Sequence, residues 1–124
     1  MKHRLTRRAT ADIARILKST RKDFGAGQML SYAGIIDDGI AMILQDPNRP
    51  ACRPQNGVGP GIKSMHLDHV RARRGSASHL VFFKEKVTKN GEAEIVILGV
   101  IHDRMMPRRK LATALREERD RDPT

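Results

Sequence analysis

The chain has 124 residues, which is the size of one compact domain and too short for two independent cores. Its 24 Lys and Arg residues against 14 Asp and Glu give a formal net charge of +10, which favours an acidic partner, either nucleic acid or an acidic protein. Aromatic residues make up only 3% of the chain, which excludes a broad base-stacking platform. The single cysteine, Cys52, excludes an intramolecular disulfide and a cysteine-based zinc site.

The N-terminus is basic and lacks the apolar stretch of a signal peptide. The longest apolar run, 95–101, is far shorter than the ~20 residues that span a membrane. We therefore expect an unprocessed protein in the reducing cytoplasm, with no membrane partner.

Two amphipathic helices are predicted at the start of the chain. Over 6–22 the apolar residues recur at helical spacing, with Thr6 as the expected N-cap and Asp12 among the charged residues of the opposite face. A second apolar series begins at Met29 and continues through Leu44, before an Asp-Pro pair ends it. Because only a few residues join the two helices, we expect an antiparallel hairpin in which each helix buries its apolar stripe.

Strand patterns dominate the next part of the chain. The many prolines and glycines of 47–61 predict one long irregular loop. Three strand-like runs follow at 63–70, 79–87 and 94–101. The last run is β-branched and almost continuously apolar, which is typical of a strand buried on both faces, and the Asn-Gly pair before it predicts a tight hairpin.

The C-terminal part predicts a short, frayed helix over 107–120, because Leu111, Ala112 and Leu115 have helical spacing, and 112–124 reads as a charged tail. Together the elements predict one domain, 1–124, of the α+β class. In this fold the N-terminal helix hairpin packs on a small antiparallel β-sheet, followed by the short C-terminal helix.

Two groups of residues resemble ligand sites, but their geometry argues against that function. His66, Asp68 and His69 carry metal-ligand groups, yet in a strand His69 points away from the other two. The glycines of 57–61 follow no predicted strand and open no helix, and Pro60 removes a backbone donor that a phosphate cradle needs. We therefore expect no metal and no cofactor.

Cationic side chains near one edge of the predicted sheet offer donors for phosphate groups, and a solvated, charged loop explains them equally well. They are Arg71, Arg73, Arg74, Lys84, Lys86 and Arg104. His102 follows the buried strand and, with Arg73 and Arg104, fits an RNA-cleaving site that needs a general base and cations. We favour the alternative that His102 and Arg104 cap the strand end and pair with Asp103. Met105 and Met106, next to basic residues, fit either a protein-docking segment or closure of the core.

Short motifs recur along the chain in a familiar order. They are Leu5-Thr6 before Ala9 and Asp12-Ile13, Phe24-Gly25 and Gln28 before Tyr32, Arg74-Gly75 before Ser78-His79-Leu80-Val81-Phe82-Phe83, and Ile97 through Val100-Ile101-His102-Asp103-Arg104-Met105 to Leu111. In this order the chain resembles the ParE branch of the RelE/ParE superfamily, the toxins of bacterial type II toxin-antitoxin modules, over about 3–111. The resemblance implies a short N-terminal strand at about 3–6.

The resemblance also implies a partner, a cognate acidic, ParD-like antitoxin whose initially disordered C-terminal segment wraps the toxin. Such antitoxins often carry a DNA-binding part, so an antitoxin-mediated hetero-oligomer on operator DNA is expected. The charge of +10 fits an acidic wrapping segment independently. Two features depart from the family pattern: the loop 47–61 is longer than the usual link, and a charged helix, 116–122, is added.

Two activities follow from the resemblance, since ParE-like members inhibit DNA gyrase and RelE-like members cut mRNA in the ribosome. The Tyr-Arg pair common in the family's middle strand is here Phe83-Lys84, and a phenylalanine cannot transfer a proton. We therefore favour gyrase inhibition by a non-enzymatic, protein-binding toxin. The expected target-binding residues are Arg104, Met105, Met106, Arg108, Arg109 and Lys110. The alternative is a ribosome-dependent mRNA endonuclease that uses His102, Arg73, Arg74 and Arg104. A third possibility is a member without toxicity that binds only antitoxin or DNA as a regulator.

Overall fold

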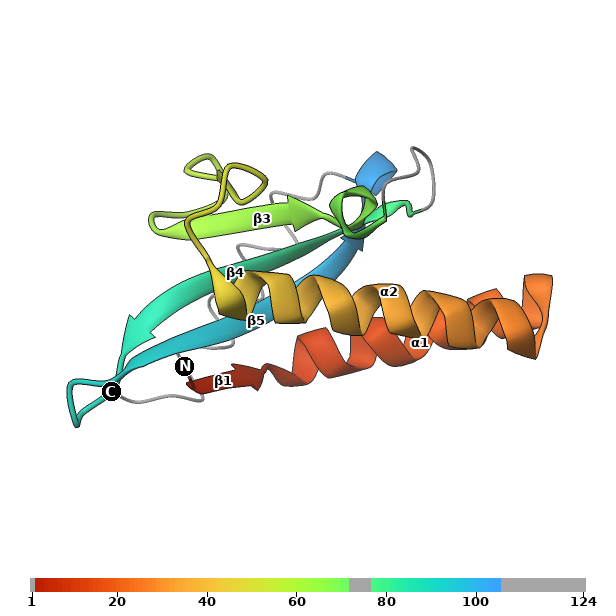
Figure 1. Cartoon of the computed structure of the whole chain (residues 1–124), viewed down its shortest axis with the longest axis horizontal. Helices are drawn as coiled ribbons and strands as arrows, with labels where there is room; N and C mark the ends of the chain where they lie inside the picture. The colour runs from red at the N-terminus through yellow and green to blue at the C-terminus, as the bar shows by residue number, and fades with distance from the viewer. Residues whose placement is uncertain (1, 72–76, 106–124) are drawn as a thin grey trace.

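The computed structural model describes residues 2–71 and 77–105 and has the predicted α+β architecture. Helices α1 (Arg7–Phe24) and α2 (Ala26–Gln45) lie side by side over one face of a five-stranded sheet (Figure 1). The predicted helix 107–120 and the charged tail lie outside the described residues. The strands, in the order β1-β5-β4-β3-β2 across the sheet, are β1 (Lys2–Leu5), β5 (Ala93–His102), β4 (His79–Val87), β3 (Ile62–His66) and β2 (Arg53–Pro54).

The sheet is mixed, where composition and pattern predicted an antiparallel one. The strand β1, which the family resemblance implies, pairs parallel to β5, with Lys2 opposite Glu94 and Leu5 opposite Ile97. The other pairs are antiparallel. An ion pair of 2.8 Å between Arg4 Nε and Glu94 Oε1 lies across the parallel pair. The first and the last strands of the described chain are therefore neighbours.

The start of α1 is tied to the sheet through its N-cap. As predicted, the Thr6 hydroxyl accepts the N–H of Ala9, at 3.1 Å, and so satisfies one of the free donors of the first turn. The same hydroxyl donates to the carbonyl of Leu98, and the Thr6 N–H donates to the carbonyl of Ile97, both at 3.1 Å. The hairpin turn at the other end of α1 is a single residue, Gly25, whose φ of +93° is readily adopted only by glycine.

The prediction that Asp12 lies on the solvent-facing side of α1 is wrong. Its side chain is fully buried between α1 and β5. Oδ2 accepts the N–H of Val100 at 3.1 Å, in the part of β5 beyond the end of β1. Oδ1 contacts the guanidinium groups of Arg8 and Arg15. The carboxylate therefore satisfies a strand donor that lacks a strand partner, and two arginines balance its charge.

Strands β4 and β5 lie within one residue of the predicted ranges and form the centre of the sheet. Residues 95–101 are all buried, so the prediction of a strand covered on both faces is confirmed. Gly91, with a φ of +78°, lies in the tight turn before β5. A register shift between Phe82 and Phe83 leaves Leu98 as an extra residue of β5, next to Gly99.

Two further predictions need correction. The strand predicted over 63–70 ends at His66, and Leu67–Val70 form the 3₁₀ helix η1. The His66 ring accepts the N–H of Asp68 at 3.0 Å, which caps this turn and draws the chain out of the sheet. The loop 47–61 is not wholly irregular, because it contains β2 at the sheet edge. Pro54 is tolerated there because an edge strand does not need its missing N–H.

Candidate functional site

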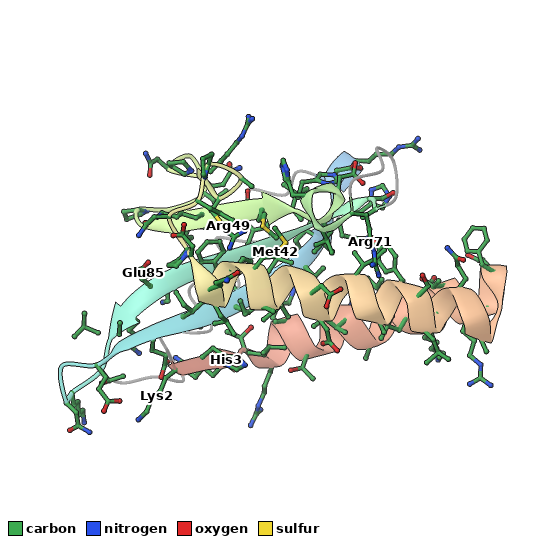
Figure 2. The ribbon with its side chains drawn as sticks, in the orientation of Figure 1. Lys2, His3, Met42, Arg49, Arg71 and Glu85 are labelled. Carbon is green, nitrogen blue, oxygen red and sulfur yellow. The ribbon has the colours of Figure 1, made fainter. Side chains whose placement is uncertain are left out.

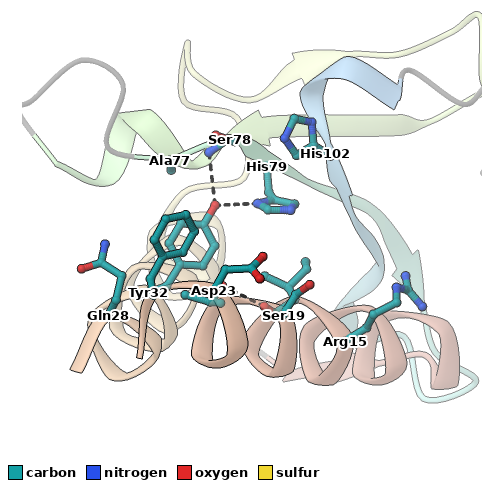
Figure 3. A pocket seen from close by; sticks show the side chains of 12 residues that line it. Arg15, Ser19, Asp23, Gln28, Tyr32, Ala77, Ser78, His79 and His102 are labelled. Carbon is teal, nitrogen blue, oxygen red and sulfur yellow. Dashed lines mark hydrogen bonds between the residues drawn. The ribbon is translucent and has the colours of Figure 1, made fainter. Parts of the chain in front are cut away.

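The main candidate site is a cavity of about 650 Å³ between the helix hairpin and the end of the sheet where β4 begins and β5 ends (Figure 3). The hairpin supplies one wall of the cavity and the sheet end supplies the other. Polar, aromatic and titratable side chains share this space. Its lining residues are Arg15, Ile16, Ser19, Thr20, Asp23, Phe24, Gln28, Tyr32, Ala77, Ser78, His79 and His102.

A hydrogen-bonded pair, Tyr32 from α2 and His79 from β4, bridges the two walls of this cavity (Figure 3). Tyr32 Oη and His79 Nδ1 are 2.6 Å apart, and the Ser78 N–H donates to the same oxygen at 3.1 Å. In the tautomer in which the Tyr32 O–H donates to Nδ1, the proton of the neutral imidazole lies on Nε2 and points away from this hydrogen bond.

The two members of this pair have shifted pKa values. Burial, reinforced by the charge of nearby His102, lowers the pKa of His79 from 6.5 to about 4. Burial also raises the pKa of Tyr32 above its usual 10.0, and the Ser78 N–H opposes this shift. At neutral pH both side chains are uncharged, so His79 offers an N–H donor and Tyr32 holds that ring in place.

His102, the predicted catalytic candidate, lies beside His79 at the end of β5. The two rings meet edge to face with their centroids 5.1 Å apart. His102 Nδ1 accepts the N–H of Arg104 at 3.1 Å and lies 3.3 Å from Asp103 Oδ1. These contacts agree with the interpretation in which His102 caps the end of the strand and lies next to Asp103. They leave Nε2 of His102 as the ring nitrogen available to the cavity.

Asp103 joins this end of the sheet to η1. His66 Nδ1 accepts from Asp68, so its Nε2 carries the proton and donates to Asp103 Oδ2 at 3.1 Å. This hydrogen bond lowers the pKa of the exposed Asp103 carboxyl below its usual value. His69 is exposed on η1, apart from this network. Within 2–71 and 77–105, no three His, Cys, Asp or Glu residues are placed to hold a metal ion.

Only part of the predicted phosphate-binding and target-binding sets lies in the described chain. Arg104 is exposed in η2 (Asp103–Met105), directly after His102, and Arg71 is exposed beside α2 (Figure 2). Lys84 and Lys86 are half-buried on β4. Arg73, Arg74, Met106, Arg108, Arg109 and Lys110 lie outside the described residues. Within these sets, His102 Nδ1 contacts the backbone N–H of Arg104, at 3.1 Å.

Sequence reasoning missed the central pair of the cavity. Tyr32 lies within the apolar series that predicts the second helix, and His79 stands out only as part of a short motif. The two residues are separated by 47 positions in the chain, so no local pattern connects them. The one available signal was compositional, because Tyr32 is the only tyrosine.

The fold and the site define a class: a small, basic α+β protein with a helix hairpin on a mixed sheet and a histidine-lined cavity at the sheet end. A family model described as the ParE toxin of the type II toxin-antitoxin system, parDE, matches residues 4–107. The chain belongs to this family of toxins, which confirms the resemblance noted from the motifs. Membership implies an antitoxin partner.

The fold also matches a solved structure described as the chromosomal ParDE TA system from P. aeruginosa. The two chains share 24% sequence identity with a TM-score of 0.62, over 82% of this chain and 95% of that chain. At this identity the likeness shows the fold alone. No curated protein matches the sequence. Neither α1 nor α2, the long helices of the described chain, is apolar enough to cross a membrane.

Proposed function

We propose that this chain is a cytoplasmic toxin that inhibits DNA gyrase by protein binding and is neutralised by an acidic, ParD-like antitoxin. The observation that carries the choice of gyrase over mRNA is the burial of Phe83. This residue stands where the family's middle strand commonly has tyrosine, and it is 0% exposed on the sheet face toward the helices. A ring with no hydroxyl and no solvent contact takes no part in cleaving RNA.

The segment from Arg104 onward is the proposed gyrase-binding surface. Arg104 is exposed where the chain leaves the sheet, and the sequence continues with methionines and then with three consecutive basic residues. Methionine adapts its shape to a partner, and clustered cations bind acidic surfaces. The proposed contact residues are Arg104, Met105, Met106, Arg108, Arg109 and Lys110.

The helix hairpin and the sheet edge are the proposed antitoxin-binding surfaces. A second cavity, of about 490 Å³, lies between α1, α2 and β1 and is lined mainly by apolar side chains such as Leu17 and Ile40. Such a groove accepts the apolar face of a partner segment, while the charge of +10 attracts its acidic residues. Any complex with operator DNA would form through the antitoxin.

A supercoiling assay tests the proposed target. Purified gyrase, plasmid DNA and ATP are incubated with the chain, and supercoiling and trapped linear DNA are measured beside mRNA integrity in a translation extract. We expect gyrase inhibition with intact mRNA. The triple change Arg108→Ala, Arg109→Ala, Lys110→Ala should weaken inhibition about tenfold or more. A matched control removes the same charge from exposed positions of α1, through Lys18→Ala, Arg21→Ala and Lys22→Ala. This control should retain gyrase inhibition.

A second candidate function is ribosome-dependent mRNA cleavage, which is supported by the two imidazoles that share the cavity. In this case His102 acts as acid or base, with Arg73, Arg74 and Arg104 around the phosphate. Codon-phased mRNA cuts with normal supercoiling would replace the gyrase proposal, and His102→Ala would abolish the cuts. A chain that affects neither reaction and leaves growth unchanged on induction would be a regulator that binds only antitoxin or DNA.

A further inference from the structure

The proposed gyrase surface leaves the Tyr32–His79 cavity without a role. Its volume of about 650 Å³ lies within the ~300–1,000 Å³ of small-ligand pockets. Its lining combines N–H donors, from Arg15 on α1 and from His79 and His102 at the sheet end, with the aromatic rings of Phe24 and Tyr32 on the hairpin. This combination indicates a ligand that is anionic in one part and flat in another.

The donor groups are Arg15, on the hairpin side of the cavity, and His79 and His102, on the sheet side. In both imidazoles Nδ1 is already used, and Nε2 has no partner among the described residues. Arg15 adds a positive charge; one of its nitrogens contacts Asp12, and its side chain remains 66% exposed. A guanidinium group and two N–H donors that line the same cavity are groups that bind phosphate.

The aromatic rings lie on the hairpin side of the cavity. Phe24 ends α1 and is 74% exposed, although it is one of only three phenylalanines in the chain, and Tyr32 and Ile16 line the same cavity. An exposed phenyl ring at the rim of a cavity offers a stacking face that any nucleobase can use. Gln28 and Asp23, also in the lining, provide amide and carboxylate groups for the polar edge of a base.

We propose that this cavity binds a nucleoside monophosphate. The phosphate lies against Arg15, His79 and His102, and the base stacks on Phe24. Tyr32 is a positioning residue, since its hydroxyl fixes the ring of His79 with Nε2–H as the free donor. The inference goes beyond gyrase inhibition and does not depend on it.

The chain offers a direct probe of this cavity. Tyr32 is the only tyrosine and the chain has no tryptophan, so the tyrosine ring signals in an NMR spectrum report on the cavity alone. The full-length protein is titrated at neutral pH with GMP, AMP, guanosine, adenosine and inorganic phosphate. We expect saturable shifts with GMP or AMP and binding about tenfold or more weaker for the nucleosides and for phosphate.

Two pairs of variants localise the ligand. Phe24→Ala should weaken nucleotide binding about fivefold or more. Leu30→Ala, a similarly exposed apolar side chain just beyond the hairpin turn that does not line the cavity, should leave it unchanged. Arg15→Gln should weaken binding of the nucleotide about tenfold, whereas Lys18→Gln, on the same helix, should not. Thermal melts confirm that each variant is folded.

The proposal fails if neither nucleotide gives a saturable shift below about 5 mM. It also fails if inorganic phosphate binds as tightly as the nucleotides, or if the Phe24 and Leu30 variants behave alike. Because gyrase is absent from the titration, its outcome is independent of the supercoiling assay.

Discussion

Asp12 shows how one buried carboxylate fixes the position of a helix. It accepts from the Val100 backbone, at a separation of 88 positions, and contacts Arg8 and Arg15 on its own helix. Gly99 is part of this arrangement, since a Cβ at that position would lie only 3.1 Å from Asp12 Oδ2. The position of α1 on the sheet therefore depends on three features: the Asp12 carboxylate, the bulge in β5 and the N-cap at Thr6.

We predict that Asp12→Ala lowers the free energy of unfolding by about 1–3 kcal/mol, because the buried Val100 N–H loses its acceptor. Asp12→Asn retains a side chain of the same shape with a carbonyl oxygen as acceptor, so it should lower the free energy of unfolding less. Urea unfolding followed by circular dichroism measures both changes. Equal losses in the two variants would show that the charge, and not the hydrogen bond, is the important contribution.

His79 makes stability depend on pH. Its pKa is about 4 in the folded chain against 6.5 in an unfolded one, so between these values the unfolded chain binds more protons. The stability contribution is therefore complete above pH 6.5 and is lost as the pH falls toward 4. The facing groups are Tyr32, His66, His102, Asp12 and Asp103, of which the two carboxylates oppose the shift.

We predict that the melting temperature decreases as the pH is lowered from 6.5 to 4, and that His79→Gln makes the decrease shallower in this window. Below that window both proteins should lose stability alike, because Asp103 and other carboxylates become protonated. Parallel profiles for the two proteins between pH 4 and 6.5 would contradict the assignment to His79.

At the scale of elements, α2 packs against η1 through a glycine. A Cβ built on Gly39 would overlap the Cδ2 atom of Leu67, which is fully buried, and would lie 3.4 Å from Val70 Cγ2. At Gly34, one helix face away, a Cβ would meet only Arg71 Nη2 at 3.9 Å. Alanine substitutions at the two positions therefore distinguish the effect of close packing on stability from the effect of helix propensity.

We predict opposite effects for the two alanine substitutions. Gly34→Ala should stabilise the chain by up to about 1 kcal/mol, since alanine favours a helix and has room there. Gly39→Ala should destabilise it by about 1–3 kcal/mol, because Leu67 must leave its buried position. Chemical unfolding of the pair measures both values, and stabilisation by Gly39→Ala would show that η1 is not held against α2.

The elements that local patterns determine were predictable. Strand-like apolar runs located β4 and β5, and the Thr6 cap located the start of α1. Features that depend on distant partners were not. A helical wheel places Asp12 on the surface, because the pattern of one helix contains no information about the Val100 N–H to which its carboxylate binds. The turn at Leu67 likewise depends on a distant partner, since Leu67 packs against Gly39 of α2. The Tyr32–His79 pair joins two elements whose individual patterns indicate only core and strand.

At the scale of the whole molecule, net charge is the property that bears most on partner binding. The charge of +10 produces a field that attracts an acidic antitoxin segment before contact. Screening shortens the range of this field to about 10 Å at 0.1 M salt. Ionic strength should therefore act on the encounter of the two proteins more than on the assembled complex.

We predict that the association rate with an acidic antitoxin falls about tenfold or more when salt rises from about 0.05 M to about 0.5 M. The dissociation rate should change much less if the antitoxin binds the apolar hairpin groove as proposed, because salt screens charges more than apolar contacts. Stopped-flow or surface-binding kinetics separate the two rates. An association rate independent of salt would argue against an acidic binding segment.

The parallel pairing of β1 with β5 also affects when the protein becomes complete during synthesis. Arg4 leaves the ribosome near the start of translation, but its partner Glu94 follows 90 positions later. The first strand therefore waits unpaired while almost the whole sheet is made, and closing so long a loop is slow. A chain that ends before β5 lacks the strand that anchors both its N-terminus and, through Val100, the first helix. We therefore expect a chain that stops short of β5 not to fold.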